Sequence, residues 1–574
     1  MARDLFPVFD PAWVAHDDGD ILVVDKPAGV PVQAHDDARR DDLVFRLERA
    51  FPGKRFAVHQ RLDRDTSGLL LFVTGGAEAN RAIAHQFEGR TIEKGYLAVV
   101  DRWDHPAALS IRAPLVEDGT HGRRMRVATG SDRNAKAAVS HVRVVRRSGV
   151  GARTLVHVTL ETGRTHQARV HLESVGAPIV GDRLYGRTPS LRLMLHATSL
   201  AFRGVSGERL RLESPAPGEF HAALEERDGA AVYDDDTLLG RAVERALFAR
   251  AFLAWTTGDG RTDAFRVVSE EGDGLPRLAV DAYAGFAVAQ FLEDDATWTE
   301  ERRARVIRAL AEAAFLGDYT KRRQKHASVS VDAGASGLAP SLPAVGGSHA
   351  DDFVVLEEGM RIPVRLGDGL STGLFLDQRA NRARVRTLAS GGSVLNLFAY
   401  TCGFSVAASL GGAWRTVSVD ASAGALERGK ELFAANDRLG SADDHFVVGD
   451  VFTLLPELRR RFGLFDLVVL DPPSFATTKR STFSAASDYA GLVADVLPLV
   501  RGGGRVLAST NHRGISPERF RGLVRRGAQQ AGRVVAHLTD LPAPLDFPAA
   551  AGAQPHLKAV LLTLAREGEK GALP

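Results

Sequence analysis

The sequence has a single cysteine, Cys402, among its 574 residues. A disulfide framework and a cysteine-based zinc site are therefore excluded, and we expect no metal. No apolar run reaches the length of about 18 residues that a membrane span requires. The first residues lack the apolar core of a signal peptide. Together these absences predict a protein of a reducing compartment, the cytoplasm, without a membrane partner.

A strong net charge is also absent, because 73 lysines and arginines stand against 71 acidic residues, which leaves +2. The bases are instead concentrated in two segments, residues 121–147 and Thr320–Lys325. Each segment could contact phosphate groups or could be a solvated basic surface. From the second segment we take Lys321, Arg322 and Arg323 as candidate contacts to a nucleic acid.

The order of apolar segments divides the chain into three parts. Residues 1–228 mix short β-type runs with glycine and proline, which predicts a mixed-sheet α+β domain. Residues 237–365 combine amphipathic helical segments with a few strands, which predicts a small α/β domain. In residues 366–574 strands alternate with helices, which is typical of a Rossmann-like, doubly wound parallel sheet. The expected fold is thus a multidomain α/β protein.

Three segments of the first part carry polar residues beside apolar strands: Ile21–Gln33, His59–Phe72 and Glu161–Gly186. In this order and spacing they closely resemble the RluA family of RNA pseudouridine synthases, over residues 15–222. The resemblance implies a pseudouridine synthase fold and isomerisation of uridine in RNA without a cofactor. One departure is visible, because Gln60 separates a histidine and an arginine that are adjacent in many members of the family.

The resemblance assigns the catalytic aspartate to Asp63, just before the apolar run GLLLFV, and not to the nearby Asp65. A buried carboxylate needs a cationic partner, and the resemblance implies Arg169. Tyr96 matches the active-site tyrosine that packs against the base. Four further residues are candidates for positioning the RNA or the motif loops: Arg61, Arg164, His166 and Gln167.

In the third part, polar residues follow successive predicted strands. Asp420 is placed to accept ribose hydroxyls and Asp450 to bind an adenine amine, while Asp471 opens the string DPPSF. Open α/β sheets bind ligands at the carboxyl ends of their strands. Isolated aspartates at strand ends are often only helix caps, so the evidence is their common order along the chain.

This order resembles class I S-adenosylmethionine methyltransferases and, more closely, the RlmI/RlmK group of large-subunit rRNA methyltransferases, over about residues 245–567. The resemblance implies S-adenosylmethionine as cofactor and catalytic roles for Asp471, Pro472, Pro473 and Phe475. Gln378 and Arg379 could equally be structural. The cofactor-binding candidates are Phe375, Asp377, Gln378, Asn396, Phe398, Tyr400, Thr401, Gly403, Asp420 and Asp450.

The residue inventory bears on which atom is methylated. The RlmI branch makes 5-methylcytosine, which needs a cysteine after the fifth strand to add to the base. Here that stretch reads VLASTNHRG, with Ser509, Thr510 and Asn511 and no cysteine. Cys402 replaces a glycine common in the group and is expected to be a packing residue. Guanine N7, which needs no covalent activation, is therefore favoured over cytosine carbon 5, with an exocyclic amine as another possibility.

The sequence thus predicts a bifunctional RNA-modification enzyme that acts on 23S-type rRNA or a precursor of the large subunit. One alternative is an active pseudouridine synthase whose methyltransferase-like half is an inactive RNA-binding module. A methyltransferase for proteins or small molecules is disfavoured by the fusion to an RNA enzyme. No protein partner is predicted.

Overall fold

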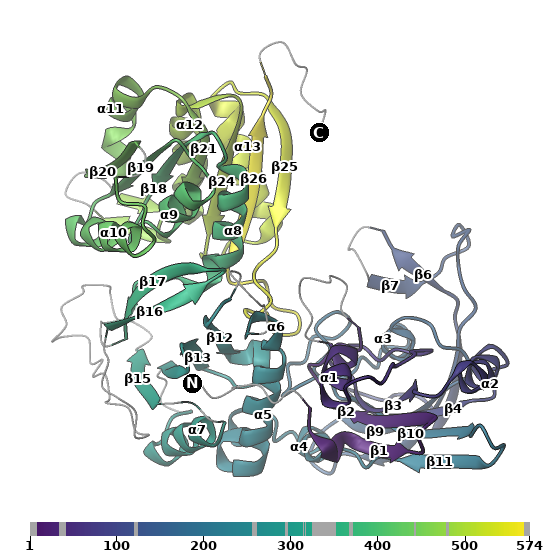
Figure 1. Cartoon of the computed structure of the whole chain (residues 1–574). Coiled ribbons are helices and arrows are strands. Elements are labelled where there is room, and N and C mark those ends of the chain that lie inside the picture. Colours follow the sequence, from purple (N-terminus) through teal and green to yellow (C-terminus); the bar gives the residue numbers. More distant parts are fainter. Residues whose placement is uncertain are drawn as a thin grey trace.

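The computed structural model describes residues 9–33, 42–119, 124–254, 261–292, 297–313, 315, 317–323, 352–366, 371–440, 443–477 and 482–566. Figure 1 shows a sheet of N-terminal strands, a smaller teal sheet beside it, and a C-terminal sheet flanked by helices. Across these described residues, no helix combines the length and apolar character needed to cross a membrane.

The N-terminal sheet has nine strands in the order β1-β2-β3-β10-β4-β9-β8-β5, with β11 paired to β10. Among the described strand pairs of this sheet only β3–β10 is parallel, which confirms the predicted mixed sheet. The hairpin β6–β7 and helices α1, α2, α3 and α4 complete this part. The bounds are β1 Val14–Asp17, β2 Ile21–Lys26, α1 Leu43–Ala50, β3 Ser67–Val73, α2 Ala77–Glu88, β4 Glu93–Val100, β5 Ala108–Arg112, β6 Leu115–Asp118, β7 Arg124–Val127, β8 Val139–Arg147, β9 Thr154–Leu160, α3 Gln167–Ser174, β10 Leu195–Arg203, β11 Arg209–Glu213 and α4 Gly218–Leu224.

The middle part is a four-stranded sheet in the order β12-β13-β14-β15, together with the hairpin β16–β17. Its apolar core is continuous with that of the N-terminal sheet, since one cluster of buried side chains extends from Leu22 to Phe315. At this junction the rings of Trp13 and Phe248 lie 5.5 Å apart, edge to face. The bounds are α5 Asp236–Phe248, α6 Ala251–Ala254, β12 Ala264–Ser269, the short helix η4 Glu270–Asp273, β13 Leu278–Tyr283, β14 Phe286–Leu292, α7 Glu300–Glu312, β15 Gly317–Arg323, β16 Asp352–Glu357 and β17 Met360–Arg365.

The C-terminal sheet has the order β20-β19-β18-β21-β24-β26-β25. Its first five strands are parallel and β26 is antiparallel to both neighbours, which confirms the predicted doubly wound fold. The strand order reverses between β18 and β21, where such sheets form a ligand crevice. The bounds are η5 Leu376–Gln378, α8 Arg379–Leu388, β18 Ser393–Leu397, α9 Gly403–Leu410, β19 Arg415–Asp420, α10 Ala423–Ala435, β20 Asp443–Val448, α11 Val451–Phe462, β21 Phe465–Leu470, β22 Phe475–Thr477, β23 Thr482–Ser484, α12 Ala485–Val496, β24 Val500–Thr510, α13 Pro517–Gln530, β25 Val535–Leu541 and β26 Lys558–Leu564.

A buried network joins the middle part to the C-terminal part: a hydrogen bond from Arg250 to the Asp546 carbonyl links an ion pair of each part. The guanidinium of Arg250 donates to both oxygens of Asp273, at 2.7 and 2.6 Å, and to the carbonyl of Asp546 at 2.9 Å. The Asp546 carboxylate in turn binds Arg379, the residue after η5. Arg379 therefore forms a structural ion pair, which is one of the two roles that the sequence allowed for it. Charges buried in this way lock the relative position of the elements, because separating them exposes an unpaired charge.

Candidate active sites

The first site centres on Asp63, in the loop that precedes the fully buried strand β3. Arg169 of α3 donates from Nη1 to Asp63 Oδ2 at 2.8 Å. The same guanidinium donates from Nε and Nη2 to the two oxygens of Asp182, at 2.7 and 2.8 Å. Asp182 is fully buried. Although burial opposes it, the two carboxylates raise the pKa of Arg169 above its usual range. Arg169 thus holds a fixed positive charge against Asp63.

Lys26, at the end of β2, stabilises the loop that contains Asp63. Its buried ammonium donates to the carbonyls of Pro27, Val30 and Arg64, at 2.9, 2.8 and 2.9 Å. Burial lowers the pKa of Lys26 to about 7, although nearby Asp65 opposes the shift. Lys26 was not among the site residues predicted from the sequence. Its signal is a lysine that ends an apolar strand directly before the turn PAG.

Tyr96 and His166 both lie near Asp63. Tyr96 of β4 is buried, and its burial together with the charge of Asp63 raises its pKa, so the phenol keeps its proton. His166 Nε2 lies 3.7 Å from Asp63 Oδ1, and its Nδ1 lies 2.8 Å from the hydroxyl of Tyr185. Burial lowers the pKa of His166, which favours the neutral ring. Tyr185 was not anticipated from the sequence.

The residues predicted to contact RNA differ in their accessibility. Arg61 is exposed and Arg164 is half-buried, with its Nε donating to the carbonyl of Ala137 at 3.2 Å. Gln167 is only 2% exposed, and its amide accepts from Thr162 and donates to the carbonyl of Val139. This burial argues against direct RNA contact by Gln167 and indicates that it holds the motif loop. Lys321, Arg322 and Arg323 belong to β15, but their side chains lie outside the described part of the structure.

The second site centres on Asp471, at the carboxyl end of β21. Ser509 Oγ donates to Asp471 Oδ1 at 2.6 Å, and Gln378 Nε2 donates to Asp471 Oδ2 at 2.9 Å. Asn381 fixes Gln378 by donating to its amide oxygen at 2.6 Å. Burial raises the pKa of Asp471 despite these hydrogen bonds. Burial and the charge of Asp471 raise the pKa of Asp377 to about 6. Ser509 and Asn381 were not among the predicted site residues.

The turn after β18 lies against the end of β19. Phe398, Tyr400 and Cys402 all have left-handed backbones, with φ of 60°, 48° and 61°. Such conformations are costly for residues other than glycine and are often found at functional sites. The turn is held by Asp420, whose two oxygens accept from the backbone nitrogens of Tyr400 and Ser422, each at 2.8 Å. Asp420 therefore lies beside the turn, as a residue facing a ribose would.

Cys402 is fully buried behind this turn, and burial raises the pKa of its thiol to about 12. A side chain on Gly429 of α10 would place its Cβ 2.4 Å from the sulfur, so the helix packs tightly over it. The thiol is neither accessible nor ionised, which agrees with the expected packing role. The left-handed backbone also explains why glycine suits this position.

The remaining predicted residues of the second site are two exposed aromatics and several residues that support the local backbone. Phe375 and Phe475 are exposed aromatics, at 49% and 67%. The Phe375 ring lies 5.1 Å from that of Tyr400, and the Phe475 ring lies 5.3 Å from that of His512. The others are supports or backbone positions: Asn396 donates to Ser405, Thr401 donates to the carbonyl of Gly373, Gly403 begins α9, Asp450 caps α11, and in the DPPSF string Pro472 is buried while Pro473 is exposed.

The raised pKa values of Asp377 and Asp471 test whether the site suits the implied cofactor. Among the described residues no side chain forms an ion pair with either carboxylate, although both are desolvated. A cationic ligand would stabilise them, because an opposite charge favours the ionised form. S-adenosylmethionine carries a sulfonium and an ammonium group, so the residues present fit it. When bound, it supplies the methyl group.

Comparison with known proteins agrees with both sites. A family model for S-adenosylmethionine-dependent methyltransferases matches residues 341–563, and one for RNA pseudouridylate synthases matches residues 20–174. A ribosomal RNA large subunit methyltransferase of Deinococcus radiodurans is 34% identical over 331 residues, covering 58% of this chain and 80% of the relative. The ribosomal RNA large subunit methyltransferase I of Serratia proteamaculans is 31% identical and covers 53% and 75%.

A solved methyltransferase structure complexed with SAH superposes with a TM-score of 0.50 at 27% identity, covering 63% of this chain and 87% of that one. Together with the family matches and the geometry of the two sites, this structural similarity establishes both activities and the cofactor. The chain belongs to the large-subunit rRNA methyltransferase family of S-adenosylmethionine-dependent enzymes and carries an RluA-type pseudouridine synthase at its N-terminal end.

Proposed function

We propose that this enzyme converts a uridine of large-subunit rRNA to pseudouridine through Asp63 and methylates a nearby purine, with guanine N7 as the first candidate. The observation that carries the first half is the hydrogen bond of 2.8 Å between Arg169 and Asp63. It keeps a carboxylate in place at the end of a rigid loop. The cytoplasmic location and the rRNA or precursor particle as partner are part of this proposal, which the names of the relatives support.

For the isomerisation, the target base has to leave its stack to reach the buried end of the loop. Asp63 acts at the ribose, either as nucleophile or as the base that removes a ribose proton. Tyr96 packs against the base and, because its phenol keeps its proton, can take part in proton exchange at carbon 5. Arg169 stabilises the carboxylate, while Arg61, Arg164 and His166 position the RNA and the loop.

For methyl transfer, the residues at the end of the fifth parallel strand, β24, argue against a covalent route. Ser509 lies there in place of a cysteine, and its hydroxyl is committed to Asp471. Cys402 is buried with a raised pKa. Guanine N7 presents an in-plane lone pair, so alignment with the methyl group suffices. Phe475 is exposed at the rim, where it can stack on the base, and Asp377, Asp420 and Asp450 hold the cofactor.

The test is mass-spectrometric mapping of rRNA modifications in a strain that lacks the enzyme, complemented with the wild type, Asp63→Asn or Asp471→Asn. We expect the deletion to lose one pseudouridine and one methylated guanine. Asp63→Asn should restore only the methyl group, and Asp471→Asn only the pseudouridine. Loss of a 5-methylcytosine instead would refute the assignment to guanine N7, and an unchanged rRNA map would refute rRNA as the substrate.

A further inference from the structure

The hydroxyl of Tyr185 has no role in the reaction proposed for Asp63. Tyr185 is buried in the segment between α3 and β10. Its hydroxyl oxygen accepts from the backbone nitrogen of Met125, in the hairpin β6–β7, at 2.9 Å. The other hydrogen-bond partner of this hydroxyl in the described part of the chain is His166 Nδ1, at 2.8 Å. Tyr185 therefore connects the hairpin β6–β7 to the histidine that lies beside the Asp63 carboxylate.

The chemistry of the three groups decides the direction of these two hydrogen bonds. A backbone N–H can only donate, so the phenol oxygen is the acceptor towards Met125. The single proton of the phenol is then directed to His166, where Nδ1 has to accept it. Burial lowers the pKa of His166, so its neutral ring carries one proton. That proton lies on Nε2, because the hydrogen bond at one ring nitrogen sets the tautomer.

The protonated nitrogen of His166 is the one that faces Asp63. His166 Nε2 lies 3.7 Å from Asp63 Oδ1, while Arg169 donates to the other oxygen, Oδ2, at 2.8 Å. An N–H at Nε2 is attracted to the carboxylate, whereas the other tautomer would turn a lone pair of the ring towards it. The distance is longer than a hydrogen bond, but catalytic hydrogen bonds are often long in free enzymes and shorten when the substrate binds. The tautomer thus offers Asp63 a second donor, at the oxygen that Arg169 does not bind.

The Tyr185 ring is held in place by contacts that do not involve its hydroxyl. Its backbone nitrogen donates to Asp182 Oδ1 at 3.1 Å, and the same oxygen accepts from Arg169. The guanidinium carbons of Arg169 and Arg124 lie 5.1 and 5.3 Å from the centre of the ring, within the range of cation–π contacts. His166 has a left-handed backbone, φ 55°, which is often found at functional sites. The hydroxyl can therefore be removed while the ring stays where it is.

We propose that Tyr185 is a positioning residue of the pseudouridine synthase, whose hydroxyl keeps the proton of His166 on Nε2 and so directs an N–H to the Asp63 carboxylate. The hairpin β6–β7 contributes through the N–H of Met125, which occupies the acceptor side of the phenol. His166 and Arg169 then face one oxygen of Asp63 each, which fixes the plane of the carboxylate before the ribose arrives. The proposal rests on Asp63 being the catalytic carboxylate of the isomerase.

The test compares Tyr185→Phe with Tyr233→Phe, both in the full chain. Tyr233 is the matched control, because its ring is buried in the middle part and its hydroxyl donates to the carbonyl of Pro276 at 2.7 Å. The tautomer of His166 is measured by heteronuclear NMR of protein with isotope-labelled histidine, since protonated and unprotonated ring nitrogens differ in chemical shift. His166→Gln assigns the signal. The kcat and KM of isomerisation are measured by tritium release from a large-subunit rRNA transcript labelled at carbon 5 of uridine, and thermal unfolding reports on stability.

We expect the proton of His166 on Nε2 in the wild type and in Tyr233→Phe, and a mixture of both tautomers in Tyr185→Phe. The kcat of isomerisation should fall roughly tenfold in Tyr185→Phe, the equivalent of one hydrogen bond, with KM and methyl transfer unchanged. A proton on Nδ1 in the wild type, a kcat equal to that of Tyr233→Phe, or a loss of kcat that only follows a loss of folded protein would overturn the proposal. If Asp63→Asn still isomerises the RNA, the proposed function fails, while the NMR comparison still decides whether Tyr185 sets the tautomer.

Discussion

Asp63 and Asp471 are the central carboxylates of the two sites, but they are held in different ways. Asp63 is paired with a charged donor, Arg169, which is itself anchored by buried Asp182. Asp471 is held by two neutral donors, Ser509 and Gln378, and its pKa is raised by burial. The first site contains a cation in hydrogen-bond contact with its carboxylate. In the second, no cation of the described residues forms an ion pair with Asp471, and Arg382 acts on it only from a distance.

This difference matches the reactions. The isomerase uses no cofactor, so the protein has to supply the cation that stabilises its carboxylate. The methyltransferase binds a cofactor that is itself cationic. A protein cation in direct contact with Asp377 and Asp471 would repel that cofactor, whereas a bound cationic ligand would favour the ionised form of these two desolvated carboxylates. Substitutions at four positions test this difference between the two sites.

The largest effect is expected at Asp63. Asp63→Asn keeps the shape but removes the charge that faces Arg169, so pseudouridine formation should fall by at least about 10³-fold. Methyl transfer should be unchanged, because the second site lies in another sheet. Tritium release from carbon-5-labelled uridine RNA and methyl incorporation measure the two. Isomerisation that survives this change would show that Asp63 is not the catalytic carboxylate.

Asp182→Asn should come next, since it leaves buried Arg169 with one carboxylate fewer. Breaking a buried pair costs about 3 kcal/mol of stability, and Arg169 would be free to rotate away from Asp63. We expect a lower urea midpoint and a reduced kcat of isomerisation. Asp132→Asn is the matched control, because its partner Arg126 is 41% exposed. Equal losses in the two variants would mean that Asp182 has no special role.

Asp377→Asn tests whether the buried Asp377 carboxylate destabilises the protein when no cationic ligand is bound. The folded-state pKa of about 6 lies above the ordinary 3.8, so the wild type loses stability through this group as the pH rises from about 4 to 6. The variant should be more stable at pH 8, by roughly 1–3 kcal/mol, and equal to the wild type near pH 4. Calorimetry should show weaker binding of S-adenosylmethionine. A variant less stable than the wild type at pH 8 would show that the buried, ionised Asp377 carboxylate does not lower the stability.

The smallest effect is expected for Cys402→Ser. The thiol is buried and un-ionised, so methyl transfer should stay within about twofold of the wild type, with a modest drop in unfolding temperature from the buried hydroxyl. Methyl incorporation into rRNA and thermal unfolding measure this. Complete loss of transfer in a folded variant would restore a catalytic role for the cysteine and reopen cytosine carbon 5.

The fold was largely predictable, because the alternation of apolar runs distinguishes a mixed sheet from a doubly wound one. The site was predictable where a residue belongs to a contiguous motif, as Asp63, Asp420 and Asp471 do. Prediction was weaker where a role depends on packing. Gln167 was expected near RNA but is buried. The contacts of Lys26 with Arg64 and of Ser509 with Asp471 were not predicted, because these partners lie far apart along the chain.

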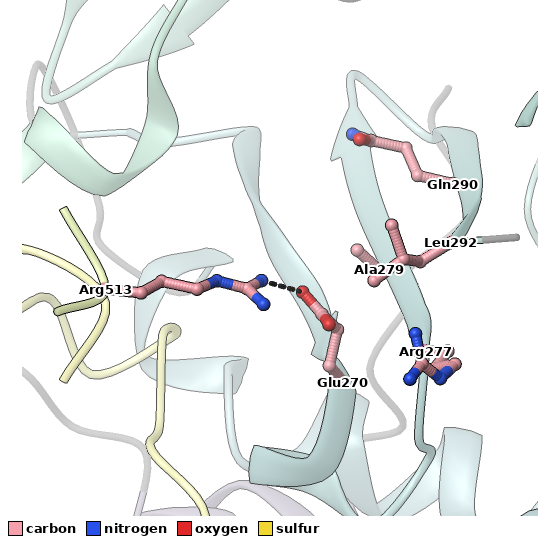
Figure 2. A pocket seen from close by; sticks show the side chains of 6 residues that line it. All are labelled: Glu270, Arg277, Ala279, Gln290, Leu292 and Arg513. Carbon is pink, nitrogen blue, oxygen red and sulfur yellow. Dashed lines mark ion pairs between the residues drawn. The ribbon is translucent and has the colours of Figure 1, made fainter. Parts of the chain in front are cut away.

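By itself, the sequence determined which chemical groups are available: carboxylates at the ends of predicted strands, and no cysteine in the stretch VLASTNHRG. Only the tertiary structure decided which of these groups meet. Arg169 reaches Asp63 across 106 positions of the chain, and Arg513 of the loop after β24 lies 3.9 Å from Glu270 of the middle part (Figure 2). The physical reason is that such contacts depend on strand order and register, which local patterns of hydrophobicity do not specify.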